Sequence, residues 1–202
     1  MPVVAVHVDD LYFNKKSNKC RYLWITLLMI FIIVAVLIIF YFTMLLPKLP
    51  QFYVNALSLT NFTSTEIVNA TWQFVFLVKN PNEFLDIKFL SLQPMIYYRD
   101  QNLSESQIIS FVQPSKSNLI FNVTFSAVNV KVGKYILYGM NKEREHGSVG
   151  FNVKIDGHMK FKYSKQRVRV LCDNIVVRIS SNSLSGKLDG GVKKCDVDFN
   201  FP

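Results

Sequence analysis

The sequence predicts a mainly β protein: an antiparallel β-sandwich with one short helix, preceded by a single transmembrane helix. Three observations support this fold class. Residues 23–46 form one long uncharged apolar run, several later segments alternate apolar and polar residues, and turn-forming residues separate those segments. Alternation with a period of two indicates strands with one buried face, and seven or more short strands in a domain of this size favour a sandwich.

The apolar run at 23–46 contains Thr26 and Thr43 but no charged residue. An uncharged run of roughly 18 or more residues is long enough to cross a bilayer as a helix. The run is longer than the apolar region of a cleaved signal peptide, and it ends at Pro47 without a small-residue cleavage site. We therefore expect an uncleaved signal-anchor helix that spans a membrane once.

Basic residues flank this helix unequally. Four of them crowd its N-terminal side: Lys15, Lys16, Lys19 and Arg21. The other flank has only Lys48 before residue 79. Because positive flanks stay in the cytosol, we expect the N-terminus to be cytosolic. The predicted segments are a cytosolic basic tail (1–22), the transmembrane helix (23–46) and an extracytosolic β-sandwich domain (47–202).

Alternating apolar faces mark the expected strands of the outer domain. They lie at 72–78, 119–127, 151–155, 168–179 and 195–201, with further strands near 52–60, 84–98 and 108–113. The apolar face of the segment 168–179 changes parity after Asp173-Asn174, which predicts a bulge. Helical spacing predicts the short helix at 131–142. Asp156-Gly157, between two alternating runs, predicts a hairpin turn, and Arg99-Asp100-Gln101-Asn102 predicts a turn as well.

The three cysteines lie in two compartments under this topology. Cys20 is at the cytosolic border of the helix, where it is either a palmitoylation site or an unmodified thiol. Cys172 and Cys195 lie in the oxidising compartment and form a pair, so we predict a disulfide between them. Such a bond closes a loop of about 24 residues and stabilises the domain by roughly 3 kcal/mol in the chain-entropy model.

The sequence favours no enzyme, cofactor or metal site. His146 and His158 each stand alone, no serine lies in a nucleophile elbow, and no glycine-rich phosphate loop occurs. Asp196 and Asp198 have the spacing of a metal-binding Asp-x-Asp, but the solvent face of a terminal strand explains both carboxylates. The chain is also too small for the α/β nucleotide-binding domain that such a metal would serve.

Four asparagines match the glycosylation sequon: Asn61, Asn69, Asn102 and Asn122. The outer domain is also basic, with nineteen Lys and Arg against twelve Asp and Glu. Five of the basic residues are close in sequence: Lys160, Lys162, Lys165, Arg167 and Arg169. They form either a landing surface for anionic wall polysaccharide or lipid headgroups, or a solvated strand whose lysines discourage edge pairing. Nucleic acid is not expected as a partner outside the cytosol.

Several short segments follow the anchor in a characteristic order. They are residues 50–54 (PQFYV), residues 57–62 (LSLTNF), the strand containing Trp72, the turn Asn80-Pro81-Asn82, Ile96-Tyr97-Tyr98, Phe111-Val112-Gln113 and the pair Cys172 and Cys195. Together with the basic tail and the signal-anchor, this order resembles the late embryogenesis abundant group 2 proteins of plants. The resemblance is to their nonrace-specific disease resistance and harpin-induced type, and it covers nearly the whole chain.

The resemblance implies a sandwich of fibronectin-III or immunoglobulin-like appearance, found mostly at the plasma membrane and in some members at plasmodesmata or endomembranes. It implies a non-enzymatic role in plant defence or stress. The domain would recognise or scaffold partners outside the cytosol, chiefly other membrane or defence-signalling proteins, while the helix binds the lipid bilayer. The alternative is a lipid- or small-ligand-binding sandwich at a membrane surface, with a cavity between two parted sheets.

Overall fold

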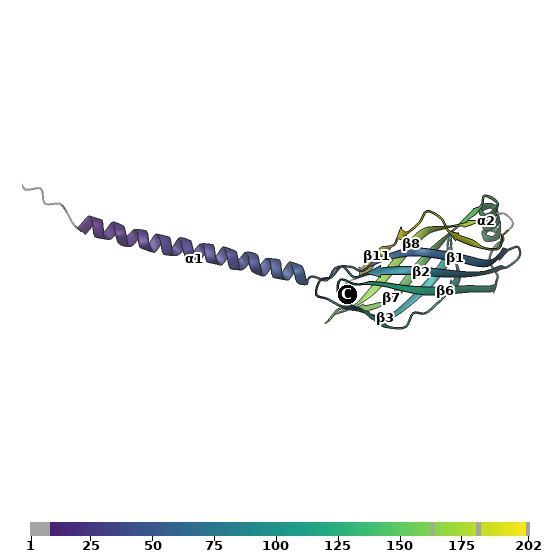
Figure 1. Ribbon diagram of the computed structural model, residues 1–202, viewed down its shortest axis with the longest axis horizontal. Coiled ribbons are helices and arrows are strands. Elements are labelled where there is room, and N and C mark those ends of the chain that lie inside the picture. The colour runs from purple at the N-terminus through teal and green to yellow at the C-terminus, as the bar shows by residue number, and fades with distance from the viewer. Residues whose placement is uncertain (1–8, 163, 181–182, 201–202) are drawn as a thin grey trace, which may run out of the picture. The chain divides into compact units, whose positions relative to one another are not determined.

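The computed structural model describes residues 9–162, 164–180 and 183–200, and the chain divides into two units after Leu46 (Figure 1). The first unit is helix α1 (Asp9–Leu45), whose segment Cys20–Phe42 is long and apolar enough to cross a membrane. The helix begins well before the predicted span, because neither Pro nor Gly occurs between residue 2 and Pro47. Much of the predicted tail is therefore helical, and its residues 1–8 lie outside the described part of the chain.

The second unit contains antiparallel strands and one further helix, α2 (Lys134–Glu145). The strands are β1 (Gln51–Ser64), β2 (Val68–Lys79), β3 (Ile87–Tyr98), β4 (Gln101–Glu105), β5 (Phe111–Gln113), β6 (Asn118–Val130), β7 (Ser148–Lys160), β8 (Lys165–Ile179), β9 (Gly186–Leu188), β10 (Lys193–Lys194) and β11 (Asp196–Asn200). The prediction of a mainly β, antiparallel domain with one short helix is confirmed.

The strands form one sheet that bends around a core instead of two separate sheets. Its order is β4-β3-β7-β8-β9-β1-β2-β6, with β5 on β3, β10 on β1 and β11 on β8. The short strand β9 joins the two halves, because it pairs with both β8 and β1. A methyl group on Gly186 would lie 2.6 Å from the carbonyl oxygen of Arg178, so glycine is needed at this junction.

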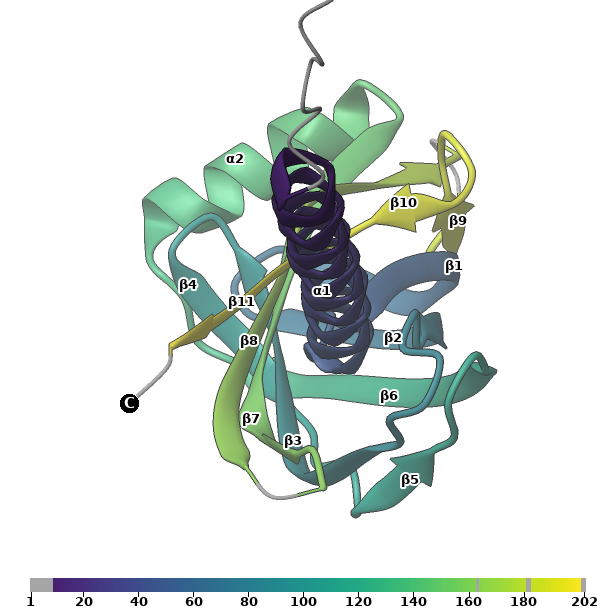
Figure 2. The same ribbon diagram turned by 90° about the vertical axis from the view of Figure 1, so that its left-hand side faces the viewer.

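The two halves of the sheet, β3–β7–β8 and β1–β2–β6, lie on different sides of the domain (Figure 2). Aromatic side chains fill the space between them. Trp72 of β2 meets Phe151 of β7 with ring centroids 5.4 Å apart, and Phe52 of β1 meets Phe89 of β3 at 5.9 Å. All four rings are fully buried. The inward faces predicted at 72–78, 119–127, 151–155 and 168–179 are those that build this core.

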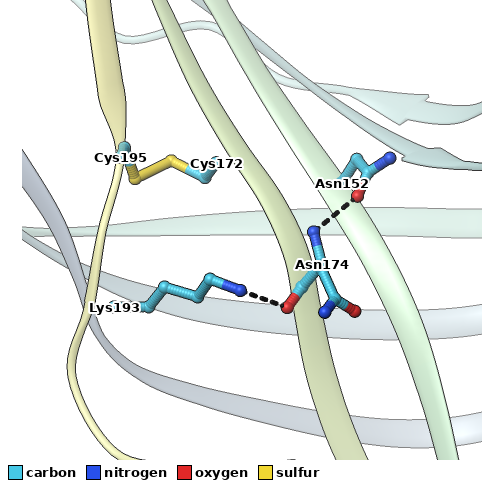
Figure 3. Close-up of a disulfide and its surroundings, with 5 residues drawn as sticks. All are labelled: Asn152, Cys172, Asn174, Lys193 and Cys195. Atoms are coloured by element: carbon cyan, nitrogen blue, oxygen red, sulfur yellow. Dashed lines mark hydrogen bonds between the residues drawn. A yellow bond between two sulfur atoms is a disulfide. The ribbon is translucent and has the colours of Figure 1, made fainter.

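The predicted bulge in the segment 168–179 is also confirmed. The register between β7 and β8 shifts opposite Asn174, which adopts a positive φ of 52°. Asn152 accepts a hydrogen bond from the Asn174 backbone N–H, and the Lys193 ammonium donates to the Asn174 carbonyl (Figure 3). The disulfide between Cys172 and Cys195 lies beside this bulge and ties β8 to the segment before β11.

The hairpin predicted at Asp156-Gly157 is wrong. Strand β7 continues to Lys160, and the turn to β8 follows, where the backbone groups of Phe161 and Ser164 bond each other. A methyl group on Gly157 would clash with the Ser91 carbonyl oxygen, next to a register shift in β3. Glycine is therefore present for a close approach of two backbones, not for a turn.

Two smaller boundaries also differ from prediction. The short helix begins at Lys134 and ends at Glu145, about three residues later than expected. The turn predicted at 99–102 is confined to Arg99 and Asp100, since Gln101 and Asn102 already pair with β3 as part of β4.

The domain has two distinct ends. The end where β1 begins also carries the loop 80–86, the loop 114–117 and the residues Phe161 and Ser164 between β7 and β8, and we call it the anchored end. Helix α2 lies at the opposite end, which we call the far end (Figure 1). Strand connections therefore bring Lys48, Phe84 and Lys160 to the same end of the domain.

Candidate anion-binding face

Three lysines lie in register across three neighbouring strands at the anchored end. Lys88 of β3 is paired with Lys160 of β7, which in turn is paired with Lys165 of β8. Register partners in antiparallel strands project from the same face with Cβ atoms about 4.5–5.5 Å apart. All three side chains are exposed, and no ion pair to any of them is found within the described residues. We call these residues the lysine row.

Like charges placed directly opposite each other destabilise a sheet by roughly 0.2–1 kcal/mol per pair. The alternative prediction, that the lysines protect an edge strand, does not account for Lys160, because β7 is paired on both sides at that residue. A bound anion offsets such repulsion.

Beyond the lysine row, the predicted basic residues separate into two groups. Arg167 is the register partner of His158, and both side chains are exposed. Arg169 instead donates to the Asp156 carboxylate at 3.0 Å, while Lys154 contacts the other oxygen of that carboxylate at 2.9 Å. Arg169 is thus ion-paired and adds less positive charge to the basic face than the lysine row does.

The Asp156 carboxylate is held in its charged form by these two neighbours. Burial on its own raises the pKa of this group, since its side chain is only 19% exposed. Hydrogen bonds and charge from Lys154 and Arg169 outweigh burial, so the net pKa of Asp156 lies below its usual value. Asp156 consequently offsets part of the positive charge of Lys154 and Arg169 on the outer face, whereas the lysine row has no such ion pair among the described residues.

A groove of about 430 Å³ opens beside the lysine row. Its lining combines cationic side chains with apolar ones: Phe84, Leu85, Asp86, Lys88, Val112, Lys160, Phe161 and Lys162. A second groove of about 650 Å³ lies farther along β3 and β7, and its lining includes Gln93, Asp156, His158 and Arg167. Ammonium groups around a shallow apolar-walled groove suit an anion with an apolar portion.

Sequence reasoning found Lys160, Lys162, Lys165 and Arg167 but missed Lys88. Lys88 lies 72 positions before Lys160, and only the register of β3 against β7 brings the two together. The exposed Phe84 was missed as well, because a single aromatic residue in a polar loop gives no periodic signal.

A separate polar cluster at the far end has a structural role. The Tyr98 hydroxyl donates to a Glu143 carboxylate oxygen at 2.7 Å, and the Gly150 backbone N–H donates to the other oxygen at 3.2 Å. Burial, followed by the hydrogen bond and the charge of Glu143, raises the pKa of Tyr98 well above its usual value. Gly139 leaves room for this contact, since a methyl group there would lie 2.8 Å from the Tyr98 hydroxyl. The cluster holds α2 against the sheet.

The remaining candidate residues do not come together into a site. Asp196 and Asp198 pair with Leu171 and Arg169 on the outer face of β11. Among the described residues, no group of three or more His, Cys, Asp or Glu is placed to hold a metal ion. His146 is exposed at the end of α2, where its Nδ1 lies 2.6 Å from the Lys142 carbonyl oxygen.

Three of the four sequon asparagines are exposed: Asn61, Asn102 and Asn122. Asn69 is half-buried, and its amide is already engaged. Its oxygen accepts from the Asn129 backbone N–H at 2.6 Å, and its nitrogen donates to the Thr63 hydroxyl at 3.4 Å. Asn69 is therefore the least accessible candidate. Cys20, the predicted palmitoylation site, is an exposed free cysteine at the first residue of the candidate membrane span.

Three related proteins of Arabidopsis thaliana align with most of this chain. An uncharacterized protein is 21% identical over 181 residues, which cover 86% of this chain and 82% of the relative. NDR1/HIN1-like protein 26 is 25% identical over 152 residues, covering 72% of this chain and 71% of the relative. NDR1/HIN1-like protein 2 is 22% identical over 162 residues, covering 76% and 68%. No family model matches the chain.

Solved structures give little further information. A protein from Archaeoglobus fulgidus aligns over 63% of this chain and 98% of its own, with 9% identity and a TM-score of 0.39. The sporulation control protein Spo0M from Bacillus subtilis aligns over 71% and 80%, with 11% identity and a TM-score of 0.24. Both TM-scores are too low to support an argument about fold or site.

Proposed function

We propose that this chain is a member of the NDR1/HIN1-like family, two of whose proteins align with it at 22–25% identity, and that it is a membrane-anchored protein of plant defence or stress response. In this role it is not an enzyme. Its β domain acts as a recognition or scaffolding module, and helix α1 keeps that module at a bilayer.

One observation carries the proposal: an apolar helix long enough to cross a membrane leads directly into a compact β domain. Buried aromatic rings fill the space between the two halves of the sheet. Partners would therefore bind to the exposed faces of the domain. This filling also gives no support to the alternative prediction of a ligand cavity between two parted sheets.

The finer parts of the proposal concern placement in the cell. The basic flank at 15–21 supports a cytosolic N-terminus and a single crossing, with residues 47–202 outside the cytosol. We propose the plasma membrane as the site, with plasmodesmata or endomembranes as the alternative. Glycosylation at exposed sequons, palmitoylation of Cys20 and membership of the broader late embryogenesis abundant group 2 belong to the same proposal.

The proposed partners are other membrane or defence-signalling proteins, together with anionic groups at the basic face. This last partner class follows from the lysine row, whose mutual repulsion a bound anion relieves. Nucleic acid is not proposed as a partner.

Complementation of plants that lack the gene tests the proposal. One line receives the full chain, a second receives residues 47–202 behind a cleaved secretion signal, and a third carries an unrelated single-pass helix in place of α1. We expect the first and third lines to restore resistance to a pathogen that proliferates in the deletion line, and the second line to fail. An unchanged pathogen load on deletion, or full rescue by the released domain, would contradict the proposal.

A further inference from the structure

We propose that the lysine row and the loop 80–86 form a binding site for anionic lipid headgroups in the same bilayer that holds α1, with Phe84 entering the interface. This inference rests on the membrane anchorage proposed above and assigns a second membrane contact to the β domain itself. The source of the anion is thereby a lipid and not a soluble polysaccharide.

Chain connectivity gives the first argument. Strand β1 begins six residues after α1 ends, so the covalent path between them is at most about 22 Å long. The loop 80–86 is fixed to this path, because the Asn82 amide nitrogen donates to the Lys48 carbonyl at 2.9 Å. In return, the Lys48 backbone N–H donates to the Asn82 amide oxygen at 2.6 Å. The loop that carries Phe84 is therefore held beside the attachment point.

The same loop is braced from within. The Asn80 amide nitrogen donates to the carbonyl of Leu85 at 2.9 Å and to that of Pro114 at 3.0 Å, while its oxygen accepts from the Asn82 side chain at 2.8 Å. Both asparagines are buried. These hydrogen bonds hold the loop in one conformation and so fix the position of the exposed Phe84 within it.

Apolar side chains around the groove give the second argument. Phe84 is 68% exposed and Val112 is 54% exposed, and Val112 is the register partner of Lys88. The row across the sheet thus runs from an apolar residue into three lysines. An aromatic ring next to ammonium groups suits the boundary between lipid headgroups and acyl chains, where each part finds a matching environment. A fully hydrated polyuronate would leave the ring exposed to water.

The local charge balance gives the third argument. Glu83, next to Phe84, forms an ion pair with Lys116 at 2.9 Å, and the hydrogen bond from Lys116 lowers the pKa of Glu83. The Asp86 carboxylate accepts a hydrogen bond from the Ser115 backbone N–H at 2.8 Å. Glu83 is thus paired with Lys116, and Asp86, which also lines the groove, is held by the loop 114–117. Among the described residues, no ion pair joins either carboxylate to the lysine row.

Spin labels on the full chain in lipid nanodiscs test the site. In a Cys20→Ser background, Phe84→Cys and Val112→Cys place the label at the proposed contact, and Tyr138→Cys places it on the exposed face of α2 at the far end. Accessibility to oxygen, which partitions into lipid, is compared with accessibility to a water-soluble nickel complex. The discs contain phosphatidylcholine alone or with 30% phosphatidylserine, on the order of an acidic leaflet.

We expect labels at positions 84 and 112 to become several-fold more accessible to oxygen relative to nickel in the anionic discs. The label at position 138 stays accessible to nickel in both kinds of disc. Adding Lys160→Gln and Lys165→Gln lowers the docked-to-undocked ratio about thirtyfold, from the strength of lysine at an anionic surface. Phe84→Cys removes the ring that is proposed to enter the interface. The label at position 112 leaves Phe84 intact and therefore serves as the control for this loss.

The outcomes separate this inference from the anchor proposal. A chain that does not stay with the discs overturns the membrane anchor. A chain that stays in the discs but keeps positions 84 and 112 open to nickel overturns the headgroup site alone. Lipid contact that is equal in neutral discs, or unchanged by the two lysine substitutions, also overturns it. So does soluble polygalacturonate that binds the lysine row while both labels remain in water.

Discussion

Replacing Lys160 by Gln should make the folded domain more stable, although the substitution removes a charged surface residue. Lys160 is the middle member of the lysine row and faces Lys88 on one side and Lys165 on the other. Two ammonium groups about 6 Å apart repel by roughly 0.7 kcal/mol in water. With two such neighbours and some splaying of the side chains, we expect a gain of about 0.5–1 kcal/mol at low ionic strength.

Lys154 provides a matched control on the same outward face of β7. It lies six residues before Lys160 and contacts the Asp156 carboxylate at 2.9 Å. Lys154→Gln therefore removes an attraction and should lower stability by up to about 1 kcal/mol. The same chemical change is thus expected to have opposite signs at two positions of one strand.

Urea unfolding of the full chain in neutral detergent micelles measures both effects. Trp72 is fully buried in the β domain, so its fluorescence reports loss of the core. With a slope near 2 kcal/mol/M, the expected gain moves the midpoint for Lys160→Gln up by about 0.25–0.5 M. At 1 M salt the screening length falls to about 3 Å, and the gain should nearly vanish. A lower midpoint for Lys160→Gln, or a gain that salt does not reduce, would refute the reasoning.

Three further predictions concern the fold. Replacing Cys172 and Cys195 together by Ala should lower the free energy of unfolding by about 3 kcal/mol, because the disulfide closes a separation of 23 residues; reduced wild-type protein serves as the comparison. An unchanged urea midpoint would argue against a stabilising bond. Gly157→Ala should cost about 1–3 kcal/mol, since its methyl group would meet the Ser91 carbonyl oxygen, and a neutral result would show that β3 yields freely there. Asp156→Asn should destabilise at pH 7 but much less at acid pH. The folded pKa of Asp156 lies below its usual 3.8, so its contribution is present above that pH and is lost as the pH falls through the folded value. A deficit that persists undiminished at pH 2 would contradict this sign.

The inward faces of the long strands could be predicted because burial imposes a strict period of two on them. Trp72, Phe74 and Phe76 must all face the core, and a slip by one residue would expose all of them. The bulge at Asn174 was visible for the same reason, as a change of parity. The prediction of turns from local residues was less reliable. Gly157 is required by the close approach of the β3 backbone at Ser91, which the residues around Gly157 do not indicate.

The candidate site was only partly predictable because it depends on pairing between distant segments. Lys160 and Lys165 are close in sequence and flank one turn, so their proximity was visible. The third member, Lys88, joins them through strand register. Arg169 looked equivalent to its neighbours in sequence, yet Asp156 on the adjacent strand forms an ion pair with it. A count of basic residues along the chain therefore overstates the contribution of Arg169 to the basic face and omits that of Lys88.

The most direct test of the whole account is the position of the β domain relative to the membrane. Full-length protein with one epitope before residue 1 and another after residue 202 is expressed in plant cells, and sealed microsomes are treated with protease. We expect the N-terminal epitope to be digested and the C-terminal epitope to survive until detergent opens the vesicles. Digestion of the C-terminal epitope in sealed vesicles, or release of the intact chain by alkaline carbonate, would contradict the account.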